Sequence, residues 1–210
     1  MPKKTFFNLP EDKRQRIIEA AIDEFAKYPY DKASINRIVE NSGIAKGSFY
    51  QYFEDKKDLY KYILELVGEE KEKYINQILK VKKELDFFEM IRQMYIAGVK
   101  FSKDNPKFAQ IANHFVKNTD ASLKEEIFGD SIPKGKEIFK GMLLRGIQKG
   151  DIDPSIDVDL VAQILTTISI SIGEYFVKEV RINDNSEIMD LVDKMLYVIA
   201  YGIKNKKGEN

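Results

Sequence analysis

The sequence predicts an all-α fold, with an N-terminal three-helix helix-turn-helix domain over residues 1–55 and a larger helical bundle over residues 56–210. Apolar residues recur at helical spacing between only six prolines and twelve glycines. Proline, serine and glycine stand where these stretches begin or end. The chain is 43% hydrophobic and 32% charged, which allows a packed core and argues against wholesale disorder.

The first predicted helix covers residues 11–28 and has one apolar side. That side consists of Ile17, Ile18, Ala21, Ile22 and Phe25. Pro10 stands just before the helix, and the negative charges of Glu11 and Asp12 in the first turn suit the helix dipole. Pro29 ends the helix, because proline disfavours helical geometry in the residue before it.

Two short helices and one longer helix follow. Ser34 is a favourable N-cap residue for the first short helix, and Gly43 suits a left-handed conformation at its end. The second short helix covers residues 45–52. Glu54 and Asp55 then open the longer helix.

The remainder of the chain is also predicted to be helical. We expect helices near residues 85–103, 106–117, 121–128, 132–149, 156–180 and 185–204. Residues 166–173 alternate β-branched and small residues, which is a strand pattern. A helical apolar stripe from Val158 to Phe176 contains that span, and no other segment offers a partner strand, so a helix is predicted.

Composition excludes several kinds of site. The chain has no cysteine and a single histidine, His114, which rules out disulfides, zinc–thiolate sites, cysteine nucleophiles and two-histidine metal sites. No phosphate-binding loop, serine elbow or HExxH pattern occurs. We therefore predict no catalytic residue, no metal, no cofactor and no enzymatic activity.

Charge and hydropathy give little indication of a partner or compartment. Lysine plus arginine and aspartate plus glutamate both total 34, so the formal net charge is zero. The N-terminus lacks the apolar core of a secretory signal. The longest uncharged stretch, residues 160–173, is too short to span a bilayer. We expect a cytoplasmic protein without a membrane partner.

Residues 34–57 carry the strongest functional signal. They predict two short amphipathic helices joined by a tight turn at Gly43, which is a helix-turn-helix. On the second helix we expect the following residues to point outward: Lys46, Gly47, Ser48, Tyr50, Gln51 and Tyr52. Such a face suits the DNA major groove and phosphate oxygens, whereas an ordinary helical corner, the alternative, gives it no packing purpose.

The same residues carry a family resemblance. The run Gly47-Ser48-Phe49-Tyr50-Gln51-Tyr52-Phe53, followed by Lys56-Lys57-Asp58-Leu59, resembles the DNA-binding domain of tetracycline-repressor-like (TetR/AcrR) regulators. The match spans about residues 11–62. Two positions depart from it: Ala45 stands where the family often has Ser or Thr, and Pro29 where it often has Gly.

The resemblance implies a set of DNA-contacting residues. These are Ser34 and Lys56 for phosphates, Lys46, Gly47 and Ser48 for the major groove, and Tyr50 and Tyr52 for the DNA backbone or a thymine methyl. A solvated lysine and a packed surface aromatic are the alternatives for Lys46 and Tyr50. Lys3 and Lys4 form either a solvated tail or an arm that reaches DNA.

The resemblance also implies a ligand-responsive repressor, with a small apolar or amphipathic effector bound among helices of the 85–180 region. Candidate lining residues are Phe88, Tyr95, Phe101, Phe108, Ile111, His114, Phe115, Ile172 and Phe176. Aromatic residues at this spacing are also typical of a helical core, and a histidine such as His114 is more often partly buried than ligand-binding.

A homodimer is implied through the helices near 156–180 and 185–204, with packing inside one chain as the alternative. Its recognition helices would read a palindromic double-stranded operator in major grooves about 34–36 Å apart. Three other functions stay open: an activator or ligand-requiring DNA binder, a helical-bundle carrier or enzyme with a vestigial DNA-binding module, and a non-specific nucleic-acid binder.

Overall fold

The computed structural model describes residues 1–81, 85–128, 131–179 and 185–201, and within these ranges all regular structure is helical. The chain forms two compact units. Unit 1 comprises Met1–Lys73 and Phe101–Ser131, and unit 2 comprises Tyr74–Lys100 and Ile132–Asn210. These units follow packing and differ from the functional division expected between residues 55 and 56, which stays a prediction.

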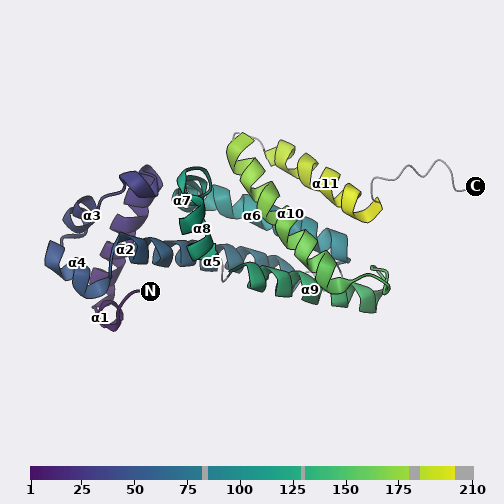
Figure 1. Ribbon diagram of the computed structural model, residues 1–210, viewed down its shortest axis with the longest axis horizontal. Coiled ribbons are helices and arrows are strands. Elements are labelled where there is room, and N and C mark those ends of the chain that lie inside the picture. The colour runs from purple at the N-terminus through teal and green to yellow at the C-terminus, as the bar shows by residue number, and fades with distance from the viewer. Residues whose placement is uncertain (82–84, 129–130, 180–184, 202–210) are drawn as a thin grey trace, which may run out of the picture. The chain divides into compact units, whose positions relative to one another are not determined.

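Unit 1 surrounds a central helix, α2, which packs against both α3 and α7 (Figure 1). The elements of this unit are α1 (Lys4–Phe7), α2 (Glu11–Lys27), the 3₁₀ turn η1 (Tyr30–Lys32), α3 (Ile35–Ser42), α4 (Lys46–Tyr52), most of α5 (Lys56–Val81), α7 (Pro106–Asn118) and α8 (Ala121–Phe128). The apolar side predicted for residues 11–28 faces the core, where Ile17, Ala21 and Phe25 are fully buried.

The predicted helix boundaries in this unit agree with the structure to within about two residues. α2 ends at Lys27, two residues before Pro29. Gly43 has a φ of +68°, and the backbone N–H groups of Gly43 and Ile44 donate to carbonyls of α3. At the start of α5, Asp55 accepts a hydrogen bond from the backbone N–H of Asp58 at 2.8 Å.

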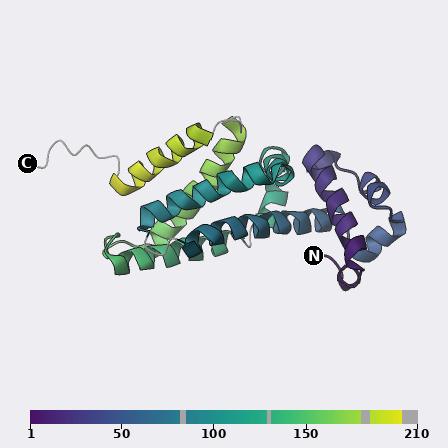
Figure 2. The same cartoon turned by 180° about the vertical axis from the view of Figure 1, so that it is seen from behind.

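Unit 2 is a helical bundle built from most of α6 (Phe87–Asp104) with α9 (Ser131–Lys149), α10 (Val158–Glu179) and α11 (Asn185–Tyr201). Figure 2 shows α6 in front of α10, with α11 alongside. The core takes residues from all four helices: Phe87, Met90, Ile91, Phe139, Met142, Leu143, Ala162, Leu165, Val192 and Leu196. Arg92 of α6 also pairs with Asp193 of α11 at 2.7 Å.

The span with a strand-like pattern is helical, as predicted. The hydroxyls of Thr166 and Thr167 donate to the carbonyls of Ala162 and Gln163, four residues earlier, at 2.8 and 3.0 Å. These β-branched residues therefore satisfy their hydroxyls within the helix. Among the residues that the structure describes, none of the helices combines the length and apolar character needed to cross a membrane.

Candidate nucleic-acid interface

A buried carboxylate fixes the start of the helix-turn-helix. Glu24 of α2 is 4% exposed and accepts hydrogen bonds from the backbone N–H of Ser34 at 2.6 Å and from Nε of Arg37 at 3.0 Å. The Arg37 guanidinium also donates to the Lys32 carbonyl and lies 4.3 Å from the ring centre of Tyr28. Hydrogen bonding to Glu24 raises the pKa of Arg37.

The sequence analysis did not predict these hydrogen bonds of Glu24 with Ser34 and Arg37. A signal for them was present, because Glu24 is seven residues after Ile17 and three after Ala21, and so lies on the apolar side of α2. Ser34 does precede α3, as predicted, but its side chain forms no capping hydrogen bond. The Ser34 hydroxyl therefore does not cap the N-terminus of α3.

The recognition helix α4 has a buried side and an exposed side. Phe49 and the following Phe53 are fully buried, as expected from their spacing. Lys46, Gly47 and Tyr50 are exposed, and Ser48 is half-buried. A Cβ atom added at Gly47 would have no neighbour within 4 Å, so the protein's own packing does not require glycine there.

Four of the predicted DNA-contacting residues come together around one shallow depression. It has a volume of about 350 Å³ and is lined by Ala33, Ser34, Ile35, Asn36, Lys46, Tyr50 and Lys56. The four belong to α4, to the start of α5 and to the residue before α3. Two ammonium groups and two hydroxyls beside the N-terminal end of α3 suit a phosphate oxygen.

Lys56 has a structural role that the sequence did not indicate. Its Nζ donates to the carbonyls of Tyr30 and Ala33 at 2.7 and 3.1 Å and lies 4.4 Å from the ring centre of Tyr30. Partial burial lowers the pKa of Lys56, and the charge of Asp31 opposes that shift. An ammonium group has three N–H donors, so one stays available for a phosphate.

The expectation that Tyr52 points outward is wrong. Tyr52 is 6% exposed; its ring centre lies 6.3 Å from that of Phe6, and the ammonium of Lys13 lies 5.9 Å from it. Tyr52 follows Phe49 by three residues, so both belong to the same side of the helix. The contact of Tyr52 with DNA, which the family resemblance implies, stays a prediction.

The N-terminal residues are not a solvated tail. The backbone N–H of Lys3 donates to the Tyr52 carbonyl at 2.8 Å, and Phe6 is fully buried. Lys4 begins α1 and is exposed. The Phe6-Phe7 pair close to Pro10 was a sequence signal for an additional packed turn.

The candidate effector residues are divided between the two units. Those in unit 1 are Phe101, Phe108, Ile111, His114 and Phe115, and those in unit 2 are Phe88, Tyr95, Ile172 and Phe176. Ile111 and Phe115 are buried in the core of unit 1, and Phe101 stacks on Phe108. The side chain of Phe176 lies outside the described residues. The effector role of this set stays a prediction.

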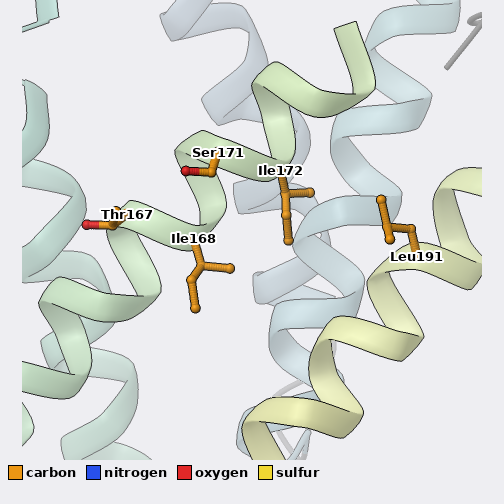
Figure 3. Close-up of a pocket in the computed structure, with 5 residues that line it drawn as sticks. All are labelled: Thr167, Ile168, Ser171, Ile172 and Leu191. Carbon is orange, nitrogen blue, oxygen red and sulfur yellow. The ribbon is translucent and has the colours of Figure 1, made fainter. Parts of the chain in front are cut away.

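Ile172 lines an open apolar groove in unit 2, together with Thr167, Ile168, Ser171 and Leu191, with a volume of about 400 Å³. Figure 3 shows Ile168 and Ile172 on the side of α10 nearer Leu191 of α11, with Thr167 and Ser171 pointing the other way. Tyr95 lies elsewhere in this unit, and its hydroxyl donates to Ser169 at 3.3 Å. Burial raises the pKa of Tyr95.

A helix-turn-helix with an exposed, partly basic second helix defines a DNA-binding protein. Residues 17–63 match the family model described as bacterial regulatory proteins of the tetR family. A crystal structure of a TetR family transcriptional regulator from Chloroflexus aurantiacus J-10-FL is 31% identical, covers 98% of this chain and 100% of that one, and has a TM-score of 0.60. The chain therefore belongs to the TetR family of bacterial transcriptional regulators.

Two further relatives extend the comparison. The structure of FadR from Bacillus subtilis in complex with stearoyl-CoA is 22% identical, with a TM-score of 0.67, and covers 90% of this chain and 99% of that one. The probable acrEF/envCD operon repressor of Escherichia coli K12 is 25% identical over 155 residues, which are 72% of this chain and 70% of that protein.

Proposed function

We propose that this protein represses transcription by binding a roughly palindromic operator, and that a small apolar or amphipathic effector releases it. The outward side of α4 carries the proposal: Lys46, Gly47 and Tyr50 are exposed on a helix that two buried phenylalanines hold in place. A Cβ atom added at Gly47 would meet no atom within 4 Å, so the packing of α4 does not require glycine at this position. The name of the Escherichia coli relative, a probable operon repressor, supports repression.

In this proposal α4 enters the major groove. Lys46 and Ser48 contact base edges, and Gly47 allows the helix backbone to approach the DNA closely. Tyr50 contacts the DNA backbone or a thymine methyl. Ser34 and Lys56 contact a phosphate from the rim of the depression described above.

The experiment that tests DNA recognition is selection of bound duplexes from random-sequence DNA with the purified protein. A palindrome should emerge, bound at least about a thousandfold more tightly than scrambled DNA. Lys46→Ala should relax base preference, whereas Lys73→Ala, which removes a lysine paired with Glu70 on α5, should not. Equal affinity for selected and scrambled DNA would refute the proposal.

The dimer is formed by α10 and α11. Large apolar side chains are exposed on both helices: Leu160, Ile164 and Ile170 on α10, and Tyr197, Val198 and Tyr201 on α11. The apolar groove lined by Ile168, Ile172 and Leu191 lies between the same two helices. Exposed apolar side chains on two long helices suit a four-helix contact with a second copy.

The effector binds in unit 2 near Tyr95. This residue of α6 donates its hydroxyl to Ser169 of α10 and lies 3.8 Å from the sulfur of Met195 of α11. A polar pair among apolar side chains orients an amphipathic molecule. The bound stearoyl-CoA of the Bacillus subtilis structure, itself amphipathic, supports this class of effector.

Titration of stearoyl-CoA into the complex with a selected duplex tests release, with free coenzyme A as the control. Stearoyl-CoA should lower DNA affinity, and DNA should lower the affinity for stearoyl-CoA by the same factor. Tyr95→Phe should weaken the response by about tenfold without changing DNA affinity in its absence. Tighter DNA binding with the effector would indicate a ligand-requiring DNA binder instead.

A further inference from the structure

The C-terminal end of α4 obtains its hydrogen-bond donors from a distant part of the chain. The last four carbonyls of a helix have no partner within it. Of the last four carbonyls of α4, only that of Phe49 accepts a hydrogen bond from a neighbouring residue, from the backbone N–H of Phe53 at 2.9 Å. The carbonyls of Tyr50, Gln51 and Tyr52 therefore need donors from elsewhere.

All three of these carbonyls accept hydrogen bonds from the first five residues of the chain. Nζ of Lys3 donates to the Tyr50 carbonyl at 2.8 Å, and the backbone N–H of Lys3 donates to the Tyr52 carbonyl at 2.8 Å. The hydroxyl of Thr5 donates to the Gln51 carbonyl between them. The ammonium of Lys3 also places a positive charge at the negative end of the helix dipole.

Phe6 anchors the segment that supplies these donors. It is fully buried, and its ring centre lies 4.8 Å from that of Phe53 and 5.6 Å from that of Tyr62. A four-residue helix such as α1 has no stability of its own, so its position depends on this packing. Phe6 thus fixes the segment against the residue that follows α4.

We propose that residues 1–7 are a positioning element for DNA recognition, with Lys3 and Thr5 as positioning residues that set the orientation of α4. The inference rests on the proposed function, because α4 is taken to be the helix that reads DNA. The main chain of Tyr50 is held by Lys3 while its side chain is exposed, so this contact acts at a residue facing the DNA. Lys3 acts through α4 and does not itself contact a phosphate.

Thr5 provides a test without a change of charge. Thr5→Val keeps the shape of the side chain and removes the donor, whereas Thr5→Ser keeps the donor. Affinity for a selected duplex should fall about three- to tenfold in Thr5→Val and recover in Thr5→Ser. The salt dependence of binding and the thermal midpoint should stay unchanged in both full-length variants, and amide exchange in α4 should accelerate only in Thr5→Val.

Lys3→Met separates positioning from direct contact. A positioning residue predicts weaker binding with an unchanged salt slope, whereas loss of a phosphate contact lowers the slope by about 0.9 for each copy. A lower slope in Lys3→Met, or unchanged affinity in Thr5→Val, overturns the proposal. If the unmodified protein selects no DNA, the proposed function fails; amide exchange in α4 then decides alone whether Thr5 positions the helix.

Discussion

The ring nitrogen Nδ1 of His114 lies 3.1 Å from the main-chain oxygen of Phe25, which links α7 to α2 within unit 1. In an uninterrupted helix the residue four positions later would donate to that oxygen, but this residue is Pro29, which has no N–H. A carbonyl oxygen only accepts, so Nδ1 of His114 is the donor in this hydrogen bond. α7 therefore supplies a donor that the sequence after α2 cannot provide.

His114→Leu should lower the free energy of unfolding by about 1 kcal/mol, because the Phe25 carbonyl loses its donor. His114→Asn places an amide N–H close to the position of Nδ1 and should retain most of the stability. Urea denaturation of both full-length variants measures the difference. Equal stability of the two would show that packing, and not the hydrogen bond, accounts for the contribution of His114.

Gly47→Ala should separate folding from DNA binding. Alanine meets no atom within 4 Å at this position and favours the helix, so the free energy of unfolding should rise by up to about 1 kcal/mol. The added methyl stands on the side of α4 that approaches DNA, so affinity for a selected duplex should fall at least about tenfold.

Gly68→Ala is the matched control for that variant. Gly68 lies in α5, is exposed and is equally free of neighbours. This substitution should also stabilise the protein, but it should leave DNA affinity unchanged. Identical DNA binding by both alanine variants would move Gly47 away from the DNA.

Lys56→Met should lower the slope of DNA affinity against salt by about 0.9 for each copy, because one phosphate contact is lost. It should also loosen the turn at Tyr30, whose carbonyl Lys56 binds. Fluorescence anisotropy over a range of salt concentrations measures the slope.

The neighbouring Lys57 provides the control, since its Nζ pairs with Glu126 of α8 at 3.1 Å. Lys57→Met should leave the salt slope unchanged. A slope that changes equally in both variants would indicate a general effect of net charge, and Lys56 would then have no contact of its own.

Tyr197→Lys should prevent dimer formation. Tyr197 is 63% exposed on α11, and its ring centre lies 5.0 Å from that of Tyr201. Analytical ultracentrifugation should show a single chain, and affinity for a palindromic duplex should fall at least about a hundredfold, because the two half-sites are no longer bound together.

Ile138→Lys is the corresponding control on α9. Ile138 is 55% exposed and lies outside the two helices assigned to the contact. The Ile138→Lys variant should sediment as a dimer, and its DNA affinity should be unchanged. Dissociation of this variant, with Tyr197→Lys still dimeric, would move the contact from α11 to α9.

The sequence was sufficient to predict the fold class and most helix boundaries, because each boundary has a local cause. Gly43 and Gly150 have positive φ, and Pro106 is the first residue of α7. Such requirements act over a few residues and are visible without knowledge of the tertiary structure.

The parts of the interface that escaped prediction depend on main-chain acceptors far away in the sequence. Lys3 binds the carbonyl of Tyr50, and Lys56 binds that of Tyr30. Every residue has a carbonyl, so residue type gives no indication of which one a lysine will reach. The spacing of three residues between Phe49 and Tyr52 indicates that both lie on the buried side of α4. A seven-residue helix has too few turns to make this pattern evident in the sequence.

The shortness of α4 limits how much DNA sequence it can read. Its seven residues span about 10 Å along the helix axis, and base pairs stack about 3.4 Å apart. One copy therefore reaches the edges of roughly three base pairs, and a pair of copies distinguishes on the order of 4,000 sequences. A genome offers on the order of a million or more competing positions, so base contacts alone leave many sites indistinguishable. The remaining information must come from how readily the DNA between the half-sites bends and twists, which a protein senses without touching those bases.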